Sequence, residues 1–150
     1  MPLVRRYRNL HTDLSRLYDG ILKKLRDTAA LDISSEVQGE IKGKMFASIT
    51  ATRKTVPKAF IGALREVTCT ITGEPDDFLV EIHAGSWFTN LIIPATGDLL
   101  VSKPLEGIAT AKKKDLIARD FQMRLAEQIR ELITKHSKVK LTLDKIQTFW

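Results

Sequence analysis

The chain has few of the residues that build disulfide and metal scaffolds. Its 150 residues include one cysteine and three histidines. A single cysteine excludes an internal disulfide and fits a reducing compartment. The sequence has no cysteine pair with zinc-site spacing and no His-Glu-x-x-His motif. We therefore expect a cytoplasmic protein that holds no metal or other cofactor.

Motifs of common enzyme classes and long apolar runs are also missing. The chain has no glycine-rich phosphate loop and no Gly-x-Ser-x-Gly elbow. No run approaches the ~18 apolar residues of a membrane span, and the amino-terminal residues lack the apolar core of a secretory signal. These absences favour a non-catalytic protein without a membrane span, although a site assembled only by the fold leaves no linear motif.

The composition is that of one soluble globular domain with a basic balance. Hydrophobic residues make up 43% and charged residues 28% of the chain. The net charge is +6 and the sequence pI is near 9.5. This charge points to an anionic partner such as nucleic acid, an acidic lipid surface or an acidic protein.

Alternation with a period of two dominates residues 66–102. Val67, Cys69 and Ile71 alternate with polar residues, which predicts a strand with one buried face. Turn residues interrupt the pattern at 73–76 and again at 85–86. The pattern predicts four short strands, at 66–72, 78–84, 87–93 and 99–101.

A strand register follows if the apolar residues share one face. It places Ile71 opposite Phe78 and Val67 opposite Ile82. The predicted core face then consists of Val67, Cys69, Ile71, Phe78, Val80, Ile82, Trp87, Leu91, Ile93, Leu99 and Val101.

The opposite face carries polar residues and, unexpectedly, four apolar ones. An exposed patch of that kind marks an interface or a ligand groove. The alternative, which we favour slightly, is that one of the chain's own helices covers it. With the aromatic residues at the end of the chain, the candidate partner-binding residues are Leu79, Phe88, Ile92, Leu100, Phe149 and Trp150.

Two segments have the spacing of amphipathic helices. Apolar residues recur every three or four positions over 12–29, where Thr12 or Asp13 can cap the helix. A second stripe from Ile117 to Ile133 predicts a helix over 112–136.

Three further segments favour strands. Apolar residues occupy most odd positions over 36–52, and two glycines and two threonines argue against a helix there, so we expect one long strand that could add to a neighbour's sheet. Residues 59–65 lead into the strand that begins at 66, and residues 138–143 suggest a last strand.

Basic residues gather in two candidate anion-binding clusters. Arg5, Arg6 and Arg8 lie in segment 1–11, which is either a flexible arm or a short strand. Lys112, Lys113 and Lys114 open the second helix, where cations oppose the helix dipole.

Two pairs of reactive residues look catalytic but are better explained as structural. Cys69 faces the core in the predicted register, whereas His83 lies on the other face opposite Glu66, so they do not form a nucleophile–base pair. Asp76 and Asp77 are adjacent and diverge, which suits a turn.

The patterns together predict an α+β domain over 1–150, in which the two helices flank an antiparallel sheet of five or six strands. We expect an interaction or assembly module that works through a protein partner or a homo-oligomer. The alternatives are a basic protein that contacts nucleic-acid phosphates, and a carrier of an apolar small molecule between the sheet and the second helix.

Overall fold

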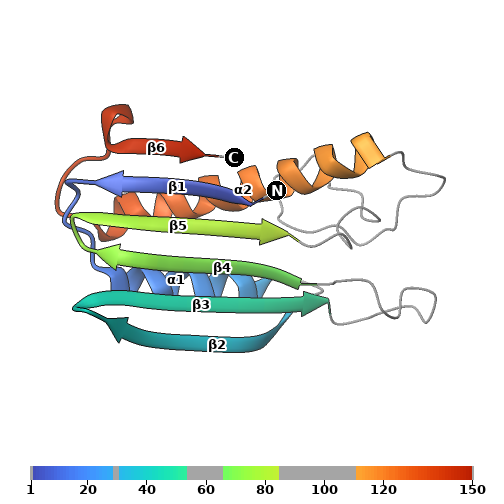
Figure 1. Ribbon diagram of the computed structural model, residues 1–150, viewed down its shortest axis with the longest axis horizontal. Coiled ribbons are helices and arrows are strands. Elements are labelled where there is room, and N and C mark those ends of the chain that lie inside the picture. The colour runs from blue at the N-terminus through green and yellow to red at the C-terminus, as the bar shows by residue number, and fades with distance from the viewer. Residues whose placement is uncertain (1, 29–30, 54–65, 85–110, 150) are drawn as a thin grey trace.

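The described part of the chain forms one antiparallel sheet with two α-helices (Figure 1). The computed structural model describes residues 2–28, 31–53, 66–84 and 111–149. The elements are β1 (Leu3–Arg8), α1 (Leu14–Asp27), β2 (Leu31–Ile41), β3 (Lys44–Arg53), β4 (Glu66–Glu74), β5 (Asp77–Ala84), α2 (Ala111–His136), a 3₁₀ helix η3 (Leu143–Lys145) and β6 (Ile146–Phe149). The prediction of an α+β fold built on an antiparallel sheet is confirmed.

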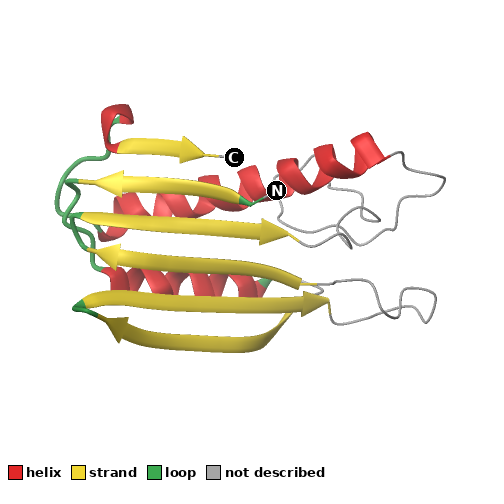
Figure 2. Cartoon of the chain, in the orientation of Figure 1, coloured by secondary structure: helices red, strands yellow, loops and turns green. Residues whose placement is uncertain are grey.

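The six strands follow the order β2-β3-β4-β5-β1-β6. Both helices lie against the same side of the sheet (Figure 2), which we call the helix face. There α1 contacts β2 and β3, whereas α2 contacts β5 and β1. Neither of these helices covers the opposite side, the outer face, so our expectation of a helix over the predicted apolar patch is wrong for Leu79, the one of its four strand residues that the structure describes.

The basic segment at the start of the chain is a strand inside the sheet. β1 pairs with β5 on one side and with β6 on the other. Leu3 and Tyr7 are buried on the helix face, and the Tyr7 ring stacks on Phe78 with centroids 5.3 Å apart. Apolar side chains at alternate positions therefore fix this segment as a strand, one of the two alternatives that the sequence left open.

The β4–β5 hairpin has the predicted faces but a different register. Ile71 lies opposite Val80, not Phe78, and His83 lies opposite Thr68, not Glu66. The strands extend to Glu74 and Asp77, which leaves a loop of two residues and moves the pairing by two positions. A shift of two preserves the faces, so the predicted core residues that the structure describes here are all buried: Val67, Cys69, Ile71, Phe78, Val80 and Ile82.

The long strand predicted over 36–52 is two strands. Lys42 and Gly43 have φ of 52° and 79° and form the tight turn between β2 and β3. Residues with positive φ at both turn positions match the twist of a hairpin. The turn places Val37, Gly39 and Ile41 on the outer face and the odd residues of β3 on the helix face, whereas a register shift between Ile33 and Ser35 keeps Leu31 on the helix face. The alternation in the sequence runs through the turn without a break and therefore does not mark it.

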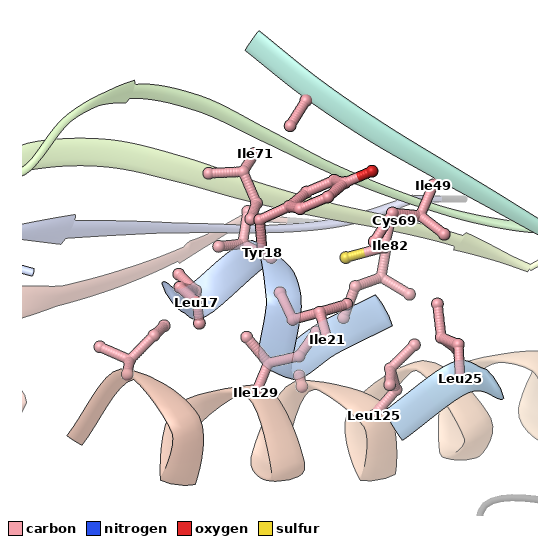
Figure 3. Close-up of a cluster of buried hydrophobic side chains, with 14 of the residues drawn as sticks. Leu17, Tyr18, Ile21, Leu25, Ile49, Cys69, Ile71, Ile82, Leu125 and Ile129 are labelled. Atoms are coloured by element: carbon pink, nitrogen blue, oxygen red, sulfur yellow. The ribbon is translucent and has the colours of Figure 1, made fainter. Parts of the chain in front are cut away.

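The helices supply the rest of the core (Figure 3). Asp13 caps α1 by accepting a hydrogen bond from the backbone N–H of Arg16 at 3.1 Å. α1 is shorter than the predicted 12–29, and α2 begins one residue before the predicted 112. The buried helix residues are Leu14, Leu17, Tyr18, Ile21, Leu25, Phe121, Leu125, Ala126, Ile129 and Ile133.

The last strand lies later than predicted. Residues 138–143 do not form a strand; β6 begins at Ile146, after η3, and pairs with β1. The strands predicted over 59–65, 87–93 and 99–101 lie outside the described residues.

Candidate functional site

Two members of the predicted apolar patch are described, and both are exposed on the outer face. Leu79 is 38% exposed and Phe149 is 43% exposed. Leu79 lies on β5 and Phe149 on β6, with β1 between these strands. The other members, Phe88, Ile92, Leu100 and Trp150, lie outside the described residues.

Alternation along β1 separates the three arginines of the first basic cluster. Arg5 lies buried on the helix face, where its guanidinium contacts the Glu127 carboxylate at 3.1 Å. Arg6 lies on the outer face and donates two hydrogen bonds to Asp77, at 2.8 and 2.6 Å. This bond to Arg6 is the main reason that the pKa of Asp77 is lowered. Arg8 is exposed.

The second basic cluster cannot be placed as a site. Lys112, Lys113 and Lys114 lie in the first turn of α2, but their side chains are outside the described part of the structure. A common site for both basic clusters therefore has no support from the described residues.

The cysteine is structural. Cys69 is buried on the helix face, and burial raises the pKa of its thiol to about 12. A nucleophilic cysteine requires a lowered pKa and access to solvent. His83 is exposed and lies on the outer face of β5. Within the described ranges, no three metal-ligating side chains gather.

Strand β2 is the candidate binding element that the sequence analysis did not predict as a separate strand. It is eleven residues long and forms one edge of the sheet. Its turn has two residues, so the flanking pair Ile41–Lys44 is hydrogen-bonded and the pairs along the hairpin then alternate. Glu36, Gln38 and Glu40 fall in the non-hydrogen-bonded pairs, and their backbone N–H and C=O groups consequently point away from β3, towards the free edge.

From Ser35 to Ile41, the side chains of β2 alternate between the two faces. Val37 and Ile41 are on the outer face, 49% and 63% exposed. Glu36 is on the helix face and accepts a hydrogen bond from the Tyr18 hydroxyl at 2.9 Å. Burial is the main cause of the raised pKa of Tyr18; a hydrogen bond with the Gln38 side chain lowers this pKa, whereas Glu36 and the charge of Asp19 raise it. The helix-face flank of this edge is therefore acidic.

A groove of about 800 Å³ lies at the turn end of the sheet, where β2 ends. The N-terminal turn of α1, the tip of the β2–β3 hairpin, the β4–β5 turn and the end of α2 surround it. Leu14 and Met45 supply apolar surface, and its carboxylates are Asp13, Glu40 and Glu74.

Hydrogen bonds hold the segments around this groove together. The backbone N–H of Asp13 donates to the carbonyl of His136 at 2.9 Å, and that of Thr12 donates to the carbonyl of Pro75 at 3.1 Å. His11 has a φ of 50°, and its backbone N–H donates to the Asp76 carboxylate at 2.9 Å. The Asp76 and Asp77 carboxylates thus serve structural bonds at the turn.

The described side chains are closely packed where Ala126 and Ile129 of α2 lie over β1 and β5. The side chains of Leu3, Tyr7, Val80, Ala126 and Ile129 meet there and leave a cavity of about 0 Å³. A carrier of an apolar molecule needs an enclosed cavity at that place, so the described residues give this alternative no support.

The chain is thus an α+β protein whose described strands form an open antiparallel sheet with the described helices on one face, and among these strands β2 has no neighbour on its outer side. None of the described helices is long and apolar enough to cross a membrane. Comparisons with protein-family models, curated proteins and solved structures find no match for this chain.

Proposed function

We propose that this protein is an interaction module that binds an extended segment of a protein partner along β2. One observation carries the proposal: the edge strand directs the backbone groups of Glu36, Gln38 and Glu40 outwards, and no described strand pairs with them. A segment that adds to a sheet edge forms main-chain hydrogen bonds there, and alternate side chains determine its specificity.

The length and surroundings of β2 support binding. Proteins commonly protect a free edge by shortening the strand or by covering it. The opposite edge follows that rule, since β6 has four residues. β2 has eleven residues, and it exposes Val37 and Ile41 beside its outward-facing backbone groups.

Selection from a display library of random peptides tests the proposal. Gln38→Pro removes one outward N–H and leaves the hydrogen bonds between β2 and β3 intact, because proline is tolerated on the free side of an edge strand. Gln38→Ala keeps the N–H and serves as the control. We expect selected peptides to bind the wild type and Gln38→Ala alike, and to lose about tenfold or more in affinity for Gln38→Pro.

Peptides that bind Gln38→Pro as tightly as the wild type would contradict the proposal. Circular dichroism of both variants checks that the fold is retained. A titration with a mixed oligonucleotide pool tests the nucleic-acid alternative, which predicts binding that Gln38→Pro leaves unchanged.

A further inference from the structure

We infer that the segment bound at β2 is an amphipathic strand with lysine or arginine on the helix-face side and apolar residues on the outer side. This inference rests on the proposed function and adds the chemistry of the partner. It follows from the way that β2 presents Glu36 and Glu40 on one face and Val37 and Ile41 on the other.

The charge of β2 is opposite to that of the chain. Residues 35–41 contain Glu36 and Glu40 and no basic residue, whereas the whole chain has a net charge of +6. Asp19 adds a carboxylate next to Tyr18 on the same side. Across a sheet, opposite charges on neighbouring strands are stabilising and like charges are destabilising. The edge therefore favours a partner strand with basic residues on this face.

The groove at the end of β2 also favours a basic residue in the partner. Glu40, Glu74 and Asp13 line it, and Lys138 is the one lysine or arginine among its described lining residues. Asp13 is already paired with Arg16 at 3.6 Å, so Glu40 and Glu74 are the carboxylates that we assign to the partner. The basic residues of the hairpin tip, Lys42 and Lys44, are not among the residues that line it. A volume of about 800 Å³ accommodates a long basic side chain whose stem contacts apolar surface while its charged end reaches the carboxylates.

A second copy of β2 is a poor partner for this edge. In an antiparallel pair of β2 strands centred on Gln38, Glu36 of each copy would lie opposite Glu40 of the other. Like charges directly opposite each other destabilise such a pair. The apolar outer face of β2 would accept either a second copy of β2 or a basic segment. The carboxylates on the helix face distinguish the two and favour the basic segment.

Fluorescence anisotropy with three labelled peptides tests the inference. In the first peptide lysine and valine alternate; in the second, glutamate and valine alternate; the third has the lysines and valines of the first in two blocks. We expect the first to bind about tenfold or more tightly than the other two at near-physiological salt. Gln38→Pro should remove this binding, and Gln38→Ala should retain it.

Charge variants provide a test that does not depend on proline. The double variant Glu36→Gln/Glu40→Gln should weaken binding of the lysine–valine peptide by about two- to fivefold for each carboxylate. The control variant Glu81→Gln/Glu131→Gln makes the same change in net charge at two exposed positions on β5 and α2. It should leave the affinity unchanged.

The outcomes separate this inference from the proposed function. If the glutamate–valine peptide binds as tightly as the lysine–valine peptide and Gln38→Pro removes both, strand addition holds and the basic partner is wrong. Equal effects of the two double variants would likewise overturn the basic partner. If none of the three peptides binds and library-selected peptides ignore Gln38→Pro, the proposed function itself fails.

Discussion

Gly73 lies where β4 approaches its turn, with a φ of 135° that side chains rarely adopt. A Cβ built there would lie 2.4 Å from the carbonyl oxygen of Asp77. We expect Gly73→Ala to lower the free energy of unfolding by about 3 kcal/mol or more, measured by urea denaturation. Gly39→Ala is the matched control, because a Cβ at Gly39 meets nothing within 4 Å; it should change stability by about 0.5 kcal/mol or less.

Burial of Cys69 gives a prediction about its reactivity. With a pKa of about 12, roughly one thiol in several thousand is ionised at a pH near 8.5, whereas an unperturbed thiol is about half ionised. We expect Cys69 to be alkylated only in molecules that are unfolded. The rate of alkylation, followed by mass spectrometry, should therefore be proportional to the unfolded fraction. Leu79→Cys in a Cys69→Ala background should react in the native state, because position 79 is 38% exposed. Rapid native labelling of Cys69 would contradict its buried placement.

The raised pKa of Cys69 also makes stability depend on pH. The folded chain retains the thiol proton while the unfolded chain loses it above a pH of about 8.5, so stability should fall as the pH rises towards 12. The fall contributed by this group is at most ~1.4 kcal/mol per pH unit. Urea titrations from pH 8 upwards should show a steeper loss for the wild type than for Cys69→Ala; parallel curves would contradict the prediction.

At the scale of single residues, the sequence predicted correctly which side chains are buried. It did not predict correctly which residues lie opposite each other on neighbouring strands. Parity alone assigned Val67, Cys69 and Ile71 to the core, because alternate residues of a strand share a face. The position of Val80 opposite Ile71 depends on the length of the turn. That length depends on how far the pairing extends towards Glu74 and Asp77, which the residue pattern does not specify.

At the scale of the elements, the β2–β3 turn contains a residue that suits it poorly. Lys42 has a φ of 52°, a conformation that costs a residue with an ordinary side chain about 1 kcal/mol. Asn-Gly is a preferred pair for such turns, so Lys42→Asn should raise the free energy of unfolding by about 0.5 kcal/mol. Lys44→Asn makes the same change in charge inside β3, where asparagine is unfavourable, and should lower it. Equal effects in urea denaturation would contradict this assignment of the turn.

The same hairpin explains why the candidate site could not be predicted. Asparagine before Gly43 would have marked a turn in the sequence, but lysine does not. Without the turn, Val37 and Ile41 were assigned to the same face as Ile49. The structure exposes Val37 and Ile41 and buries Ile49, and only this reversal makes β2 a free edge with an acidic side and an apolar side.

At the scale of the whole molecule, the sequence could not show which strands are neighbours. β1 comes from the start of the chain and β6 from its end, yet they pair with each other. Arg5 of β1 also contacts Glu127 of α2. These contacts join residues more than a hundred positions apart, and local alternation carries no information about them. The position of β2 at the edge of the described sheet depends on this order, because β1 and β6 pair elsewhere.

The net charge of the molecule also shapes the binding that we propose for β2. A chain of charge +6 repels a basic peptide at long range, although Glu36 and Glu40 attract it at short range. At about 0.01 M salt the Debye length is roughly 30 Å, so the distant positive charges act fully; at about 0.1 M it is roughly 10 Å, and they are largely screened. At about 1 M it is roughly 3 Å, so even the contacts with Glu36 and Glu40 weaken.

The affinity for the lysine–valine peptide should therefore be greatest near about 0.1 M salt and lower at both extremes. Fluorescence anisotropy across this range measures the profile. In Glu36→Gln/Glu40→Gln the local attraction is removed while the repulsion remains, so its affinity should rise with salt throughout. An affinity of the wild type that increases steadily down to the lowest salt would show that attraction outweighs the net charge at every distance. That result would mean that the peptide binds an acidic surface that is more extensive than the edge of β2.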